Sequence, residues 1–274
     1  MKPGIYKDLD INTYHASVGL SSSGIRLLLK SPKKYWFKYI SGLSVDDKSS
    51  DDQVFGNAVH TAILEPGAFD SRYFVTEKIT RSGKKWQDIL AAAGGKYVLF
   101  DTDYSAIQSI LRSISEVSIV KQLIGNGNVE QSLYWNEQET GSLCKTRPDF
   151  FNEQCVIEIK TTRDASKSEF AKSIHNYGYH VQAAMQLDGI KSLTGSAPPY
   201  FMFIAIEKEV PFVTSAYLLS ERDIEQGRRL YKKALVTYQD CINRNYWPGY
   251  GDQLEEISLP VWAIDEDLRE VNYV

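Results

Sequence analysis

Four residues of the chain could together hold a divalent metal beside a charged amine. Glu158 follows Asp149 by nine positions, and Lys160 follows Glu158 by two. His60 lies far upstream, in a Gly-Asn-Ala-Val-His segment. Two carboxylates that converge repel each other unless a cation lies between them, and Mg²⁺ or Mn²⁺ binds through such oxygens. A metal, a water and a lysine gathered at one phosphate suit phosphodiester hydrolysis, and this is the chemistry that the residues predict.

The spacing of these residues predicts a hairpin that brings the two acids together. Residues two apart in a strand share a face, so Glu158 and Lys160 point the same way. A half-exposed strand would show the same alternation and is the plain alternative. Pro148 lacks a ladder donor and suits a strand end or bulge, which places Asp149 at a turn beside Glu158. The backbone carbonyl of Ile159 is then a further candidate ligand.

Other candidate residues lie outside this hairpin. Glu130, at the start of a strand, could add a carboxylate near the metal. Gln182 and Gln186 lie one helical turn apart and could hold a phosphate or a lysine, although solvated glutamines would look the same. His60 is also compatible with a purely structural histidine, and its candidacy depends on the acids around it.

The elements expected to position these residues alternate between helices and strands. Before residue 125 we expect mainly helices, with a loop at 44–53. The basic segment 79–97 contains three glycines and is expected to be a mobile, substrate-facing loop, with an idle surface loop as the alternative. After residue 125 we expect three meandering strands, then a helix, two strands and a last helix. The expected helices are 25–29, 33–40, 54–64, 103–123, 166–193 with an interruption near 177–178, and 221–243. The expected strands are 129–135, 142–151, 155–161, 200–206 and 211–219.

The bulk composition describes one large domain over residues 1–274, with a helical region at 1–125, a sheet core at 126–250 and a tail at 251–274. The 274 residues are 43% hydrophobic and 24% charged, which is ordinary for a globular protein. No run of about 18 apolar residues predicts a membrane span. Three cysteines without close spacing favour a reducing, cytoplasmic compartment and argue against a zinc knuckle. No phosphate loop, dinucleotide fingerprint or serine nucleophile elbow is found.

The net charge of −4 counts mildly against nucleic-acid binding but permits a local basic groove. The segment 33–40 interleaves lysines with aromatic residues and could grip a strand. A helix with an aromatic core face and solvated lysines is the alternative.

The motifs resemble the PD-(D/E)XK nuclease superfamily, and within it the RecB-like branch and the RecE-type exonucleases. The resemblance rests on Pro148-Asp149, on Glu158-Ile159-Lys160, on Gly56 four positions before His60, and on the helix with Gln182. The opening at residues 20–32 is similar too, so the likeness spans about residues 5–250.

The resemblance implies an α/β fold with a central mixed sheet flanked by helices and an amino-terminal helical region. It implies an exonuclease that uses Mg²⁺, with Mn²⁺ as a substitute, to degrade the 5′-ended strand of linear double-stranded DNA during recombination. It also implies a homotetrameric ring and a RecT-like single-strand annealing partner. A ring would reconcile the acidic composition with DNA binding, because basic residues could line its channel.

The same resemblance assigns roles to individual residues. His60, Asp149 and Glu158 would be metal ligands together with the Ile159 carbonyl, and Lys160 would be the catalytic lysine. Gln182 falls on the glutamine of a Gln-x-x-x-Tyr motif, whereas Gln186 replaces the tyrosine, which leaves its role open.

Two other functions stay open from the sequence. One is a DNA-binding module that kept the nuclease fold without activity, and the other is a metal-dependent hydrolase of another phosphorylated substrate. The presence of both acids and the lysine favours the nuclease over the first. The lysine–aromatic segment and the basic segment near Lys84 favour it over the second. The sequence leaves the number of metals open.

Overall fold

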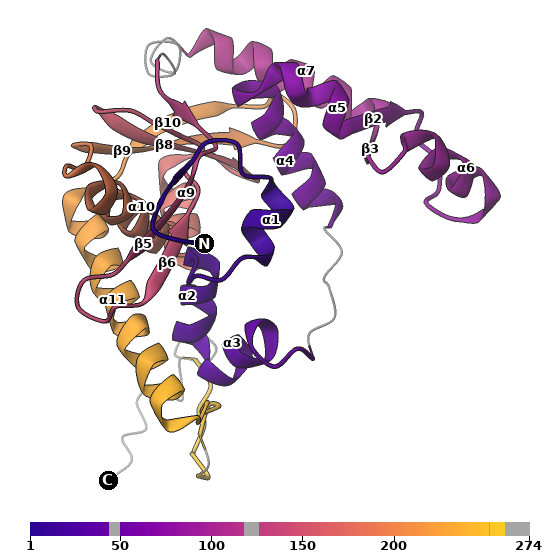
Figure 1. The fold of residues 1–274 in the computed structure, drawn as a ribbon. Coiled ribbons are helices and arrows are strands. Elements are labelled where there is room, and N and C mark those ends of the chain that lie inside the picture. Colours follow the sequence, from indigo (N-terminus) through magenta and orange to yellow (C-terminus); the bar gives the residue numbers. More distant parts are fainter. Residues whose placement is uncertain (44–49, 118–125, 252, 261–274) are drawn as a thin grey trace, which may run out of the picture.

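The computed structural model describes residues 1–43, 50–117, 126–251 and 253–260. Its centre is a five-stranded mixed sheet in the order β10-β9-β8-β7-β4 (Figure 1). Strand β8 runs parallel to β9 and antiparallel to β7. The bounds are β4 Asn128–Val129, β7 Phe150–Phe151, β8 Cys155–Thr162, β9 Tyr200–Glu207 and β10 Thr214–Leu218. This architecture agrees with the mixed sheet and flanking helices expected from the sequence.

A second, three-stranded sheet corrects the predicted meander. It has the order β1-β5-β6, with β1 Gly4–Tyr6, β5 Ser132–Asn136 and β6 Leu143–Thr146. The expected continuous strands 129–135 and 142–151 are therefore each divided between the two sheets. One break falls at Glu130, whose backbone is left-handed (φ 49°), and the other at Arg147-Pro148-Asp149. Proline cannot donate to a ladder, so the chain leaves one sheet there and enters the other.

Helices cover both faces of the central sheet. One face packs against α4 (Asp51–Leu64) and α7 (Asp101–Glu116) through an apolar cluster that includes Ile157 and Ile159. The other face packs against a larger cluster built with α2, α9, α10 and α11. These helices span Ser22–Lys30, Lys167–Asn176, Tyr179–Thr194 and Glu221–Arg244. Strand β8 is thus buried on both faces, and the half-exposed alternative for it is wrong.

Several helix boundaries differ from the prediction for local reasons. Helix α4 begins at Asp51, inside the expected loop, because Ser50 and Gln53 form a capping box. Helix α7 begins at Asp101 and ends at Glu116, and the remainder of its expected length, 118–125, lies outside the described residues, as does 44–49 of the loop. The expected break near Tyr177 is confirmed, since α9 and α10 meet there.

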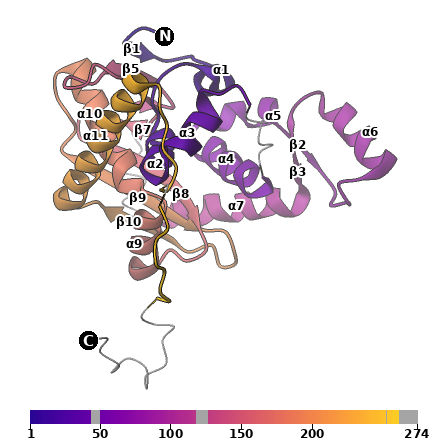
Figure 2. The same cartoon turned by 90° about the horizontal axis from the view of Figure 1, so that it is seen from below.

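The expected loop at 79–97 is instead largely helix α6 (Gly83–Ala93), followed by β3 (Tyr97–Phe100). Its glycines delimit the helix: Gly94 adopts the left-handed C-cap conformation (φ 59°). Strand β3 pairs in parallel with β2 (Tyr73–Thr76), which follows a 3₁₀ turn (Pro66–Ala68) and α5 (Phe69–Arg72). These elements form an arm, residues 69–100, that projects from the body (Figures 1 and 2).

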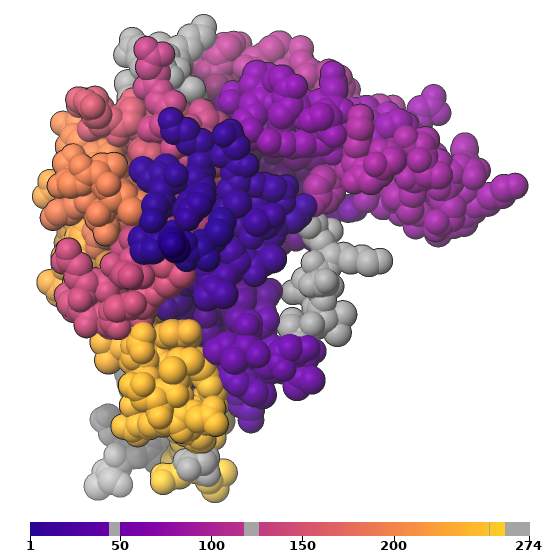
Figure 3. Space-filling model, in the orientation of Figure 1, coloured from indigo at the N-terminus to yellow at the C-terminus, as the bar shows by residue number. Residues whose placement is uncertain are grey.

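Two short helices lie on the same side of the body as the amino terminus. Helix α1 (Ile11–Ala16), which the sequence did not reveal, is capped by the Asp10 side chain. Helix α3 (Pro32–Tyr39) buries Tyr35 against Trp247 with the rings stacked 5.8 Å apart, which supports the aromatic core-face alternative. Figure 3 shows the amino-terminal segment packed between the body and the base of the arm.

Candidate active site

The break between the two sheets places three metal-ligating side chains together. Ligand atoms of His60, Glu130 and Asp149 all lie within 4.8 Å of one another. His60 comes from α4, and its Nδ1 is 3.5 Å from Asp149 Oδ1. Glu130 and Asp149 occupy the two strand breaks, which are joined by a bond from the Glu130 N–H to the Asp149 carbonyl (3.1 Å). Glu130, which the sequence offered only as a possible additional carboxylate, is therefore part of this cluster.

The hairpin between β7 and β8 brings Asp149 alongside Glu158, as the spacing predicted. The Asp149 N–H points to Glu158 Oε1 at 3.4 Å. The Ile159 N–H donates to Asp149 Oδ2 at 2.7 Å, so this backbone position is in direct contact with the acid. Ile159 also borders the cleft described below, which keeps its carbonyl among the candidate ligands.

Glu158 is held by three side chains. Lys160 Nζ lies 2.5 Å from Oε2, and Gln182 Nε2 donates to the same oxygen at 2.8 Å. Gln186 Nε2 donates to Oε1 at 2.6 Å. Gln186 is completely buried, so the solvated-glutamine alternative is wrong for it. Among the described residues, its Oε1 is the single buried side-chain oxygen or nitrogen that lacks a hydrogen-bond partner.

Burial and neighbouring charges shift the pKa values of the three acids of the site. Burial and the nearby Asp149 carboxylate raise the pKa of Glu130 to about 7, against attraction from His60 and Arg147. Burial and Asp149 also raise the pKa of Glu158. Burial opposes ionisation of Asp149, but His60 and Lys160 outweigh it and lower its pKa. Carboxylate oxygens that are forced together against burial fit a hard divalent ion such as Mg²⁺ or Mn²⁺.

The acids raise the pKa values of the two basic residues, Lys160 and His60. Burial lowers the pKa of Lys160, but Glu158 and Asp149 more than offset this and raise it. Burial also lowers the pKa of His60, but the Asp149 carboxylate has the larger opposite effect, so the pKa of His60 is raised. A permanently charged Lys160 ammonium suits the stabilisation of a phosphate.

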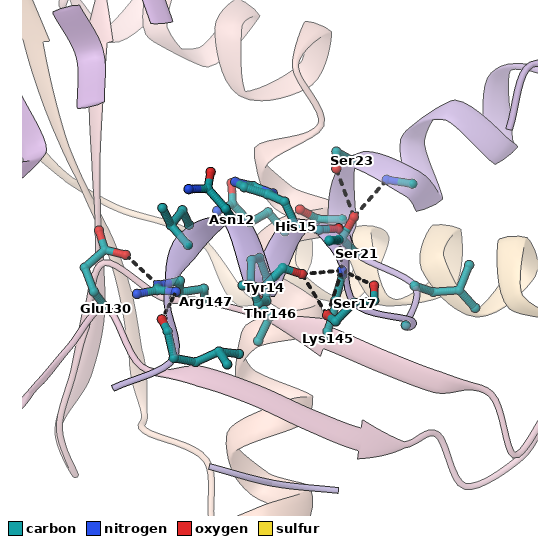
Figure 4. Close-up of a pocket in the computed structure, with 18 of the residues that line it drawn as sticks. Asn12, Tyr14, His15, Ser17, Ser21, Ser23, Glu130, Lys145, Thr146 and Arg147 are labelled. Carbon is teal, nitrogen blue, oxygen red and sulfur yellow. Dashed lines mark hydrogen bonds and ion pairs between the residues drawn. The ribbon is translucent and has the colours of Figure 1, made fainter. Parts of the chain in front are cut away.

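The cluster opens into a cleft of about 1510 Å³. Helix α1, the start of α2, α4 and β6 contribute to its walls. In Figure 4, Arg147 reaches Glu130, and Lys145 points among Tyr14 and Ser17. Arg147 Nε is 3.1 Å from Glu130 Oε2, and Lys145 Nζ donates to the carbonyls of Tyr14 and Ser17 at 2.7 Å.

Sequence reasoning assigned no role to Lys145 or to helix α1. Lys145 looks like any strand lysine, and only the folded chain shows that it ties α1 to β6. The Asp10 cap before a six-residue segment was the one local signal for the helix, and so short a segment carries little periodicity. Arg147, which directly precedes Pro148, was assigned no role from the sequence, and the structure places it as the partner of Glu130.

The chain belongs to the family described as a PDDEXK-like domain of unknown function (DUF3799), whose profile matches residues 21–260. The mixed sheet with flanking helices is the fold of this nuclease class. No curated protein compared with the chain matches it. No helix within the described residues is long and apolar enough to cross a membrane.

Three solved structures resemble the chain to different degrees. A candidate exonuclease from Eubacterium rectale superposes on the chain with a TM-score of 0.60 at 11% sequence identity. The superposition covers 97% of this chain and 99% of that one. A phage-related exonuclease from Haemophilus somnus 129PT superposes with a TM-score of 0.36 at 10% sequence identity, over 83% of this chain and 96% of that one. An alkaline exonuclease from Laribacter hongkongensis superposes with a TM-score of 0.29 at 13% sequence identity, over 69% of this chain and 91% of that one. At 11% sequence identity, the similarity to the Eubacterium rectale protein shows the fold alone.

Proposed function

We propose that this protein is a Mg²⁺-dependent exodeoxyribonuclease that degrades the 5′-ended strand of linear double-stranded DNA. The product would be a 3′ single strand for recombination. The main support for the proposal is that the cluster of His60, Glu130 and Asp149 lies next to the Glu158–Lys160 pair.

His60, Asp149 and Glu158 would hold the metal with the Ile159 carbonyl, and Glu130 is the additional ligand that the geometry favours. When bound, Mg²⁺ would activate water and stabilise charge on the phosphate oxygens, and Mn²⁺ could substitute for it.

The protein's own residues would orient the reaction. Lys160, charged and fixed by Glu158, would stabilise negative charge that develops on the phosphate. Gln182 and Gln186 would hold the Glu158 carboxylate in one orientation, because each donates to a different oxygen. Asp149 would keep its own orientation through the Ile159 N–H.

The finer proposals rest on the motif resemblance. They comprise a RecE-type activity in the cytoplasm, a homotetrameric ring around DNA, and transfer of the product strand to a RecT-like annealing protein. The buried Glu158–Lys160 pair, the Gln182 helix and the His60 position support the first of these. The lysines of α6, the arm helix, add an exposed basic group that suits DNA.

Linear duplex DNA with a label at either the 5′ or the 3′ end tests the proposal. We expect Mg²⁺-dependent loss of the 5′ label first, and a rate lower by about 100-fold or more in Lys160→Ala. Lys172→Ala, an exposed lysine on α9, is the matched control. Digestion from the 3′ end would contradict the polarity. Intact DNA with both Mg²⁺ and Mn²⁺ would favour a binding module or a different phosphorylated substrate.

A further inference from the structure

The corner between α9 and α10 lies beside the catalytic lysine and is held rigidly. Gly178, at the corner, has a left-handed backbone (φ 63°), and a Cβ there would lie 2.6 Å from Arg26 Cδ. Arg26, from α2, fills that space and donates to the Tyr177 carbonyl. The two tyrosines on either side of Gly178 are therefore fixed in place by a neighbouring helix.

These two tyrosines form a stack that leads away from Lys160. The Lys160 Nζ lies 5.0 Å from the centre of the Tyr179 ring. The Tyr177 ring stacks on Tyr179, with 5.6 Å between centroids and 26° between planes. Tyr179 is packed inward against Phe170 and Phe203. The stack thus runs from the charged amine of the site to the protein surface.

Tyr177 forms the outer end of the stack and is 56% exposed. Within the described part of the chain its hydroxyl makes no hydrogen bond, and its one ring partner is Tyr179. Exposed aromatic residues are common and need no explanation by themselves. Here the exposed ring lies next in line after Lys160 and Tyr179. That alignment leaves one aromatic face free beside the position of a scissile phosphate.

The inner ring of the stack, Tyr179, borders the cleft of the site, whereas Tyr177 lies outside its lining. Tyr39, Arg26 and Tyr179 line the same cleft as His60 and Lys160. Its volume of about 1510 Å³ is somewhat above the roughly 300–1,000 Å³ of pockets that hold a drug-sized ligand, which suits a few nucleotides.

From this geometry we infer that Tyr177 stacks on an unpaired nucleobase of the strand being cut, next to the scissile phosphate. Aromatic side chains stack on any base, because every base has a π-face. Such a contact would be independent of sequence and would hold the strand while its phosphate lies at Lys160. The inference rests on the proposed nuclease function and adds a contact that separates the strand end from its partner.

Kinetics on modified ends test the inference. Tyr177→Ala should lower kcat/KM on unmodified linear duplex by about tenfold, whereas Tyr177→Phe, which keeps the ring, should match the wild type. Abasic sites are placed one at a time at the first four nucleotides of the digested strand. At the stacking position the wild type should fall to the rate of Tyr177→Ala, and the variant should lose nothing further.

Tyr200→Ala is the matched control, because Tyr200 is 51% exposed and pairs with Cys155, at the opposite end of β8 from Lys160. Equal rates for Tyr177→Ala and the wild type, or an equal abasic penalty in both proteins at every position, would overturn the inference.

A binding measurement separates this inference from the nuclease function. A single-stranded oligonucleotide with 2-aminopurine is titrated with wild type, Tyr177→Ala and Tyr177→Phe in EDTA, where no hydrolysis is expected. Quenching that needs the aromatic ring supports stacking even if no DNA is cut. Cleavage by the wild type without ring-dependent quenching or kinetics would reject the stacking site and leave the nuclease intact.

Discussion

Strand β8 and helix α6 carry the two sets of lysines that the sequence assigns to substrate, and they lie in opposite surroundings. On β8, Lys160 is paired with a buried acid, and apolar clusters cover both faces of the strand. On α6, Lys84 and Lys85 are exposed on an arm that projects from the body. One region has each charge fixed in a single orientation, and the other presents charge to whatever approaches. Substitutions in the two regions should therefore differ in size and in kind.

The largest effect is expected for Asp149→Asn. This change removes the charge of a carboxylate that contacts His60 and accepts a hydrogen bond from the Ile159 N–H. We expect DNA cleavage to fall by about 1,000-fold and Mn²⁺ binding, measured by calorimetry, to weaken strongly. Asp88→Asn on α6 is the matched control and should leave both unchanged. Full activity in Asp149→Asn would exclude this acid from the reaction.

A smaller but clear effect is expected for Gln186→Leu. Glu158 loses the donor to Oε1, and partners that orient a metal ligand typically contribute 10–100-fold to metal affinity or activity. We expect a loss in that range, measured as metal affinity and as initial rate. Gln87→Leu, exposed on α6, is the control. If metal affinity stays unchanged in a folded Gln186→Leu protein, the residue is a packing residue only.

The pH dependence of stability should distinguish Glu130 from an arm residue. Its pKa in the folded protein is about 7, above the ordinary value of 4.5. A carboxyl group with a raised folded pKa binds more protons when folded, so its contribution to stability is lost as pH rises from about 4.5 to 7. Metal-free protein should therefore melt at lower temperature at pH 7.5 than at pH 5. Glu130→Gln should flatten this slope, and Glu77→Gln in the arm should not.

The smallest effect is expected for the arm itself. Lys84→Ala with Lys85→Ala should weaken DNA binding several-fold at low salt and leave the saturated rate unchanged. The slope of log affinity against log salt should fall by up to about 2, since each phosphate contact contributes about 0.9. A double variant of Lys191 and Lys233, both outside the cleft, is the control. An unchanged salt slope would remove the arm lysines from the DNA contact.

The features best predicted from the sequence depend on short-range signals. The spacing of Asp149 and Glu158 about a three-residue turn fixes their approach, and the Gly178 signal marks the helix break. The lengths of β8 and β9 follow from apolar runs bounded by turns. For these elements local pattern and tertiary environment agree.

The features that the sequence did not reveal depend on contacts across the fold. Glu130 and Pro148 each end a strand in one sheet, but only pairing with distant partners shows that a second sheet begins there. The glycines near α6 were interpreted as flexibility, whereas Gly94 ends a helix. Lys145 acquires its role from carbonyls more than 125 positions away in the chain.

The position of the ligand cluster at the break between the two sheets has a consequence for any attempt to reduce the protein to a smaller unit. His60, Glu130 and Asp149 come from three separate places in the chain, and Gln186 from a fourth. Each pair is brought together by contacts of long sequence separation, which form late because loop closure must come first. A peptide with only the segment 147–160 would carry the recognisable motif but could not assemble the ligand cluster. Metal binding by this cluster would thus depend on the completed tertiary structure, and it could serve as a sensor of correct folding.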